Sequence, residues 1–121
     1  MTRKDTGILG EQIAKHFLIE RGYQIIETNY RCREGEIDII TRKDDYLIFV
    51  EVRAKRSRAF GMPEESVTAT KKKHLRAVAG RYYETHADLP ELWRIDFVAI
   101  ELTGAGQLKR IELIENAIED E

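Results

Sequence analysis

The sequence predicts a single α/β domain, residues 1–121, with a central mixed β-sheet flanked by helices in the order α-β-β-β-α-β-β. Three observations predict it. A chain of 121 residues, 42% hydrophobic and 35% charged, suits one soluble core. Two segments repeat apolar residues at helical spacing, and shorter segments between and after them are rich in strand-forming residues. Three consecutive strands before a crossover helix imply both parallel and antiparallel pairing.

The first element is expected to be a helix over residues 7–21. Apolar side chains recur every four positions from Leu9, and Gly22 follows as a C-terminal stop. At 100° per residue, Glu11 lies about 20° from Leu18, at the edge of the apolar face. Its carboxylate should therefore point toward whatever the helix packs against.

Three strands should follow the first helix. They are expected over residues 23–28, 35–41 and 46–53, with a polar loop over 29–34 and a turn over 42–45. The short turn makes the second and third strands a hairpin.

The second half of the chain begins with a basic, irregular segment over residues 54–62. A second helix begins after Pro63, in one piece or two, and is clearest over 70–84. Two final strands, over 92–102 and 108–114, are separated by a glycine-rich turn.

Charge is unevenly distributed along the chain. The net charge is only −2, but residues 53–81 hold nine Lys or Arg against two Glu, and residues 112–121 hold five acids and no base. A polyanion could bind the first region. No apolar run is long enough to span a bilayer, and the lone Cys32 suits a reducing compartment, so we expect a cytoplasmic protein without a membrane partner.

Two acids in the predicted hairpin stand out because each lies between aliphatic residues. If the turn has two or four residues and paired positions sum to 87, Asp38 opposes Phe49 and lies diagonal to Glu51 on one face. A three-residue turn would put the two acids on opposite faces. Asp96, in a later strand, is expected to pair with Arg94 or another base rather than to act in catalysis.

Two interpretations of these acids remain open. Asp38 and Glu51 could each end an edge strand and pair with a nearby base. Together on one face, however, they would repel each other unless a hard cation such as Mg²⁺ or Mn²⁺ joined them. The backbone carbonyl of Val52 could supply another oxygen ligand, and Glu11 could approach the same cation or a second one. Such a cation can activate water for phosphodiester hydrolysis.

Two segments carry a resemblance to a known superfamily. Residues 35–40, Gly-Glu-Ile-Asp-Ile-Ile, and residues 49–55, Phe-Val-Glu-Val-Arg-Ala-Lys, resemble the core of the PD-(D/E)XK nucleases. The whole chain resembles the YraN-type family of small, uncharacterised endonuclease-like bacterial proteins. This wider likeness rests on Gly7, Gly10-Glu11, the basic loop before Gly35, Phe60-Gly61 with Pro63, Lys71-Lys72-Lys73 and Arg94-Ile95-Asp96.

The resemblance implies a restriction-endonuclease-like fold and a magnesium-dependent endonuclease, a hydrolase. Asp38 and Glu51 would be metal ligands, Glu11 an accessory acid, and residue 53 the catalytic lysine. The superfamily is also related to archaeal Holliday-junction resolvases, which suggests branched DNA as a substrate. DNA is therefore favoured over RNA, and a two-fold homodimer would suit a junction.

The chain departs from the superfamily pattern at Arg53. Arginine stays protonated and cannot act as a general base, although it can hold phosphate. Lys55, two residues on, or a lysine at the start of the second helix could substitute. The catalytic candidates are therefore Asp38, Glu51, Arg53 and Lys55.

Nucleic-acid binding is expected from the basic region, where charge neutralisation dominates affinity. Its candidate residues are Arg53, Lys55, Arg56, Arg58, Lys71, Lys72 and Lys73. Two alternatives to a nuclease stay open: a non-catalytic nucleic-acid-binding module of the same fold, or a small interaction protein that dimerises through strand edges. A protein that recruits the domain is a further expected partner.

Overall fold

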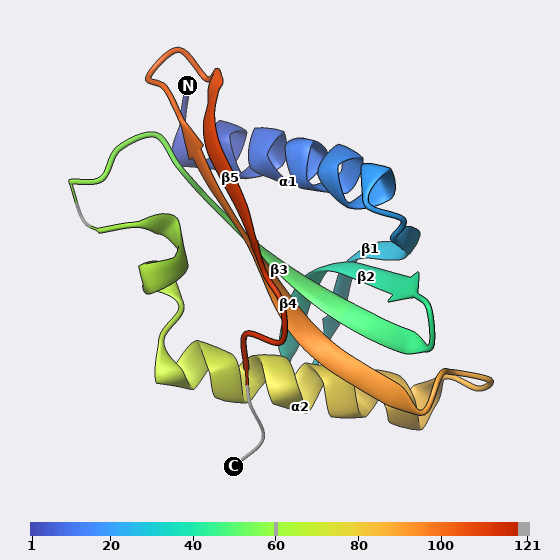
Figure 1. Ribbon diagram of the computed structural model, residues 1–121. Coiled ribbons are helices and arrows are strands. Elements are labelled where there is room, and N and C mark those ends of the chain that lie inside the picture. Colours follow the sequence, from blue (N-terminus) through green and yellow to red (C-terminus); the bar gives the residue numbers. More distant parts are fainter. Residues whose placement is uncertain (60, 119–121) are drawn as a thin grey trace.

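The computed structural model describes residues 1–59 and 61–118, which form a five-stranded sheet with one long helix on each face (Figure 1). Helix α1, Arg3–Glu20, packs on one face and helix α2, Ala69–Thr85, on the other. A short 3₁₀ helix, η1, Pro63–Ser66, precedes α2, so the second helical region is in two pieces. The predicted α/β class and element order are confirmed.

The sheet has the strand order β1-β2-β3-β4-β5. Its strands are β1, Gln24–Cys32; β2, Gly35–Lys43; β3, Tyr46–Lys55; β4, Leu92–Leu102; and β5, Leu108–Ile114. β3 and β4 are parallel because η1 and α2 cross over between them, and the other three pairs are antiparallel. The mixed sheet expected from three strands before a crossover helix is therefore present.

Each face of the sheet has its own hydrophobic core. Under α2, Phe49 packs with Leu75, Val78 and Tyr82, and under α1, Val50 packs with the apolar stripe of that helix. Alternate residues of β3 thus enter opposite cores, which is why this strand is nearly continuously apolar. Neither helix among the described residues combines the length and apolar composition that a bilayer-spanning helix needs.

Helix α1 begins at Arg3, earlier than its apolar repeat predicts. Thr2 and Asp5 form a capping box: the Asp5 N–H donates to the Thr2 hydroxyl at 3.1 Å, and the Thr2 N–H donates to the Asp5 carboxylate at 2.9 Å. The first turn is therefore stabilised by polar contacts. The helix ends where expected, before Gly22 at φ +87°.

The polar loop predicted over residues 29–34 was wrong. β1 continues through this stretch to Cys32, and only residues 33–34 turn. β1 is an edge strand whose residues alternate between exposed and half-buried positions, so polar side chains are compatible with it. The strand also has a register shift between Ile25 and Glu27 and a positive φ at Asn29. Both interrupt the regular alternation from which a strand is predicted.

The buried Asp96 is a structural anchor. Its carboxylate accepts hydrogen bonds from Arg94 Nε at 3.0 Å, the Tyr23 hydroxyl at 3.0 Å and the Asn116 backbone N–H at 2.8 Å. The predicted pairing with Arg94 is confirmed. Burial, followed by the nearby Asp96 charge, raises the pKa of Tyr23 to about 12, so its hydroxyl stays a donor.

Candidate metal and nucleic-acid site

The hairpin register brings the two candidate acids level with each other. Lys43 pairs with Tyr46, and the ladder continues to Ile39 opposite Val50, so the next step aligns Asp38 with Glu51. The predicted register, with Asp38 opposite Phe49, was wrong by two residues. Because side chains alternate with a period of two, this shift keeps both acids on a shared face and brings them closer.

The error in register came from the turn. It consists of Asp44 and Asp45 alone, and Asp44 adopts a φ of +54°, a conformation that Asp tolerates. Arg42 and Lys43, assigned to the turn for their polarity, remain in β2. The Lys43 ammonium lies 4.9 Å from the centre of the Tyr23 ring, which gives this charged strand end a packing partner.

Asp38 takes the place of a missing ladder bond. Its Oδ2 accepts a hydrogen bond from the Val52 backbone N–H at 2.8 Å, just beyond the last paired residues of β2 and β3. The N–H and C=O of one strand residue point to the same neighbouring strand. The Val52 carbonyl therefore faces the edge where Asp38 lies. A carbonyl that serves as an oxygen ligand beside Asp38 must point in this direction.

Glu51 is held in an almost fully buried position, with 3% of its side chain exposed. Its Oε2 lies 2.7 Å from Arg53 Nη2 and 3.6 Å from the Lys71 ammonium. Its Oε1 is buried without a hydrogen-bond partner, and so is Arg53 Nε. A buried carboxylate oxygen without a donor is costly and calls for a proton or a cation.

The two carboxyl groups are electrostatically coupled. Burial, and then the charge and hydrogen bonding of Glu51, raise the pKa of Asp38 to about 8. Asp38 therefore keeps a proton near neutral pH, which relieves its repulsion with Glu51. A divalent cation that replaced this proton would relieve the same repulsion.

The donor set fits a magnesium-like ion better than zinc or calcium. Within residues 1–59 and 61–118, no group of three His, Cys, Asp or Glu side chains converges on one point. Mg²⁺ commonly binds through one or two carboxylates and keeps several waters, whereas calcium sites collect six to eight oxygens. Two carboxyl groups with an unpartnered oxygen meet the smaller requirement.

The third acid suggested by the sequence lies elsewhere. Glu11 is half-buried on α1, and its Oε2 accepts a hydrogen bond from the Asn29 side chain of β1 at 3.2 Å. The structure does not gather Glu11 with Asp38 and Glu51 into one cluster.

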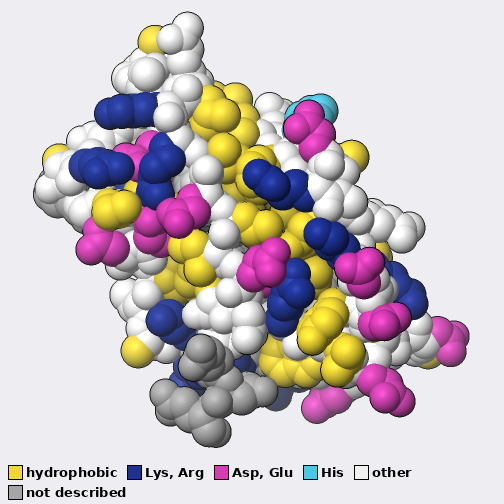
Figure 2. Space-filling view, viewed as in Figure 1, with side chains coloured by type: hydrophobic (Ala, Val, Ile, Leu, Met, Phe, Trp, Pro, Cys, Tyr) yellow, Lys and Arg dark blue, Asp and Glu magenta, His cyan; other side chains and the backbone are white. Residues whose placement is uncertain are grey.

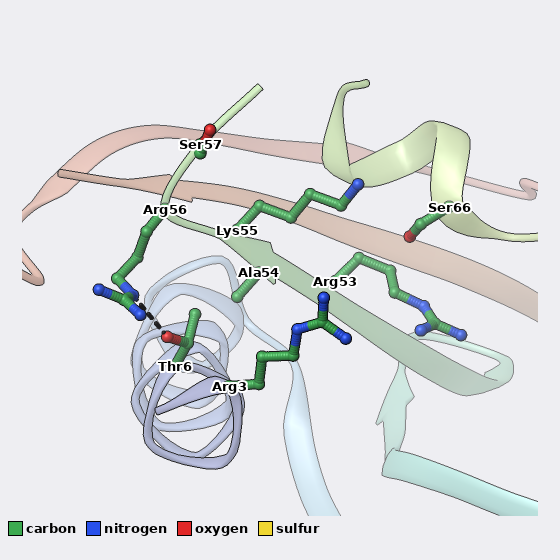
Figure 3. A pocket seen from close by; sticks show the side chains of 8 residues that line it. All are labelled: Arg3, Thr6, Arg53, Ala54, Lys55, Arg56, Ser57 and Ser66. Carbon is green, nitrogen blue, oxygen red and sulfur yellow. Dashed lines mark hydrogen bonds between the residues drawn. The ribbon is translucent and has the colours of Figure 1, made fainter. Parts of the chain in front are cut away.

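The basic residues after Glu51 have different surroundings. Arg53, Lys55 and Arg56 line one cavity of about 550 Å³ at the end of β3, together with Arg3 from the first turn of α1 (Figure 3). Sequence reasoning missed Arg3, because only tertiary packing brings the first turn of α1 to the end of β3.

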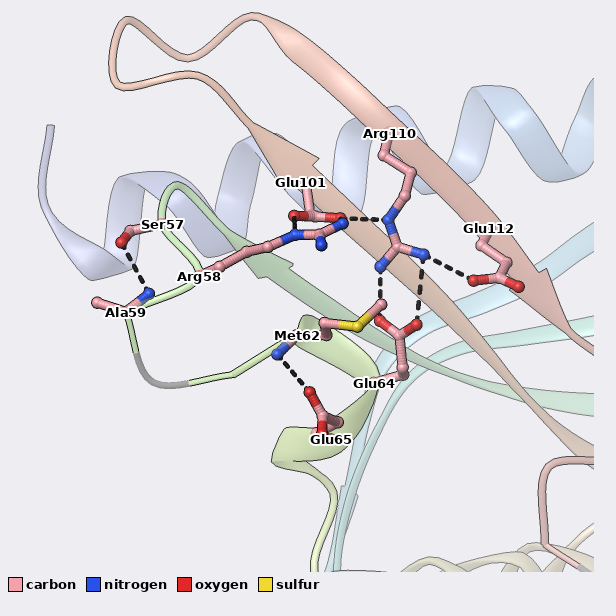
Figure 4. A network of polar contacts seen from close by, with 9 residues as sticks. All are labelled: Ser57, Arg58, Ala59, Met62, Glu64, Glu65, Glu101, Arg110 and Glu112. Carbon is pink, nitrogen blue, oxygen red and sulfur yellow. Dashed lines mark hydrogen bonds and ion pairs between the residues drawn. The ribbon is translucent and has the colours of Figure 1, made fainter.

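Arg58 does not line that cavity and takes part in an ion-pair network instead (Figure 4). It donates to the buried Glu101 of β4, which also pairs with Arg110 of β5, and Arg110 pairs with Glu64 of η1 at 2.6 Å. The network ties the segment after β3 to the far edge of the sheet. On the face seen in Figure 2, basic side chains accordingly lie beside acidic ones rather than in one basic patch.

Of the three lysines that start α2, only Lys71 contacts a candidate acid. Thr68 caps the helix by accepting a hydrogen bond from the Lys71 N–H at 3.1 Å, and the Lys71 ammonium lies near Glu51. Lys72 is half-buried and Lys73 is exposed.

Comparison with known proteins identifies close relatives. The model of a family described as "Uncharacterised protein family UPF0102" matches residues 10–100. A UPF0102 protein of Dehalococcoides mccartyi is 47% identical over 119 residues, covering 98% of this chain and 97% of that protein. One from Roseiflexus castenholzii is 44% identical over 120 residues (98% and 96%), and one from Caldicellulosiruptor bescii is 42% identical over 118 residues (97% and 99%).

Proposed function

The chain belongs to the UPF0102 family, and we propose that it is a metal-dependent nuclease that hydrolyses phosphodiester bonds, acting on DNA in preference to RNA. The observation that carries the proposal is the meeting of the Asp38 and Glu51 carboxyl groups beside an unpartnered buried oxygen. The proposal includes kinship with the PD-(D/E)XK nucleases. Two acids on adjacent hairpin strands, followed by a basic segment, support that kinship.

The ion would be Mg²⁺ or Mn²⁺, held by Asp38, Glu51 and the Val52 carbonyl. When bound, it supplies activation of a water nucleophile and stabilisation of charge on the phosphate oxygens. Arg53 can donate hydrogen bonds to a phosphate oxygen through its guanidinium. The Asp38 hydrogen bond to Val52 fixes the carboxyl group before any ligand arrives.

Lys71 is the better candidate for the lysine that position 53 lacks. Its ammonium lies 3.6 Å from Glu51 Oε2, whereas Lys55 lines the neighbouring cavity with Arg3. Lys71 is half-buried and comes from α2, so its place does not depend on the β3 pattern. In this proposal Arg53 binds and orients the phosphate group, and Lys71 supplies the ammonium group beside the carboxylates.

A second function is favoured by one contact. The 2.7 Å ion pair between Arg53 and Glu51 satisfies a carboxylate oxygen that a cation would otherwise use. A module that binds nucleic acid through its basic residues without cutting it would keep this pair intact.

The test is cleavage of labelled linear, single-stranded and four-way-junction DNA, with matched RNAs, in Mg²⁺ or Mn²⁺. Asp38→Asn and Glu51→Gln should lower the rate roughly 100-fold or more, because even indirect metal contacts are worth 10–100-fold. Asp45→Asn is the matched control: it removes an exposed carboxylate from the turn of the same hairpin, and it should cut like wild type.

The outcomes separate the two functions. Metal-dependent cutting lost in both site variants supports the nuclease. Absence of cutting, with salt-sensitive binding that survives both substitutions, supports the binding module. A protein that neither cuts nor binds nucleic acid would refute both functions.

A further inference from the structure

We propose that the cavity at the end of β3 binds a second phosphate of the nucleic-acid strand, next to the one held at the carboxylates. This inference rests on the proposed function and adds a requirement to it: the smallest ligand that fills both places has two neighbouring phosphates. Arg53 joins the two places, because it contacts Glu51 and also lines the cavity.

The lining of the cavity suits an anion. Among residues 1–59 and 61–118, the charged residues that line it are Arg3, Arg53, Lys55 and Arg56, with no acid, and Ser57 and Ser66 add hydroxyl groups (Figure 3). A volume of about 550 Å³ exceeds what a phosphate alone needs and leaves room for the attached sugar. Arginine forks match phosphate oxygens in pairs, which favours phosphate over a simple halide.

Two of these cations, Arg56 and Arg3, have different surroundings. Arg56 is a structural residue: it donates from Nε to the Thr6 hydroxyl at 2.9 Å and from Nη2 to the Met1 carbonyl at 2.6 Å, which fixes the start of α1. Arg3, by contrast, is exposed and has no hydrogen-bond or ion-pair partner within the part of the chain that the structure describes. Arg3 is therefore the cation that a ligand can recruit at least cost.

Arg53 supplies the second available donor group. Its Nη2 pairs with Glu51, but its Nε is buried and has no acceptor. Because protein atoms enclose that Nε, a ligand in the cavity meets the exposed part of the guanidinium, whose N–H groups a phosphate oxygen accepts strongly.

The backbone of β3 is also open at this point. The ladder with β2 ends at Val50, so Ala54, whose N–H points to the same edge as that of Val52, has no ladder partner there. Ala54 lines the cavity. Residues 53–55 lie about 7–13 Å along the strand from Glu51 at ~3.3 Å per residue, a short reach for an extended polynucleotide.

The experiment measures binding without catalysis. Thymidine dinucleotide with no terminal phosphate, with a 5′-phosphate or with a 3′-phosphate is titrated into the protein in EDTA, and backbone amide shifts are followed by NMR. One of the two phosphorylated forms should bind wild type roughly fivefold more tightly than the bare dinucleotide, as one partly exposed ion contact allows. The shifts should include the amide of Ala54.

Two variants test whether this gain in affinity for the phosphorylated dinucleotide arises in the cavity. Arg3→Ala should abolish it, whereas Lys4→Ala, which removes the same charge from the neighbouring exposed position, should preserve it. Equal behaviour of the two variants would overturn the inference. So would inorganic phosphate binding as tightly as the phosphorylated dinucleotide, because the cavity would then hold a free anion and not a strand.

The result is distinguishable from failure of the proposed function. If Asp38→Asn abolishes cleavage while Arg3→Ala and Lys4→Ala bind all three dinucleotides alike, only the second phosphate site is refuted. If no form of the protein cuts, yet the Arg3-dependent gain is measured, the nuclease is refuted and the phosphate site stands.

Discussion

The close packing of α1 on β3, the strand that holds Glu51 and Arg53, can be tested quantitatively. A Cβ added at Gly10 would lie 2.5 Å from the Ala54 Cβ, far inside the 3.4–4 Å of ordinary contact. The obstructing atom belongs to a short side chain on a central strand and cannot swing away. Gly10→Ala must therefore push α1 off the strand that holds Glu51 and Arg53.

The magnitude can be worked out against a matched control. Gly7→Ala adds the same methyl group to the same helix with nothing within 4 Å, so it should gain about 1 kcal/mol of helix propensity. Gly10→Ala gains the same propensity but is overpacked, at a cost of about 1–3 kcal/mol. The difference between the two variants isolates the overpacking and should lower the melting temperature of Gly10→Ala by roughly 5–10 °C relative to Gly7→Ala.

Thermal and urea unfolding followed by circular dichroism measure both variants. Combining Gly10→Ala with Ala54→Gly removes the obstructing methyl group, and a double-mutant cycle should show a favourable coupling. Equal stability of Gly10→Ala and Gly7→Ala would refute the close packing of α1 on β3.

Three further predictions concern stability. The folded-state pKa of Asp38, about 8, lies above its ordinary value of 3.8, so the stability that its protonation contributes is complete below about pH 4 and lost as pH rises through 8. Asp38→Asn stays neutral at every pH. In urea titrations without metal, its free energy of unfolding should rise relative to that of wild type by a few kcal/mol between pH 5 and 8; parallel curves would disprove the raised pKa of Asp38. Tyr23→Phe removes a donor to the buried Asp96 and should cost about 1–2 kcal/mol in urea unfolding; no loss would argue against that hydrogen bond. Glu101→Gln leaves two arginines without their shared carboxylate and should lower the melting temperature more than Arg58→Gln does; the reverse order would contradict the network.

Much of the fold could be predicted from local pattern. The bounds of β4 and β5 match the prediction because an apolar run and a glycine-rich turn mark them. The start of α1 was missed because its first turn is fixed by the Thr2–Asp5 capping box rather than by apolar residues. The second half of β1 was missed because an exposed edge strand can be polar.

The site was predictable only in part. A turn with an even number of residues puts Asp38 and Glu51 on one face, but the register depends on the conformation of Asp44, which apolar alternation does not reveal. The approach of Lys71 to Glu51 arises from packing between distant segments. No spacing in the sequence encodes it.

The most direct test of the paired carboxylates is a count of bound Mn²⁺ from the electron paramagnetic resonance signal of the free ion. Wild type and the control Asp45→Asn should bind one ion with the same affinity, and Asp38→Asn and Glu51→Gln should each bind it at least tenfold more weakly, since both supply ligands. Equal binding by all four proteins would contradict a metal site at Asp38 and Glu51.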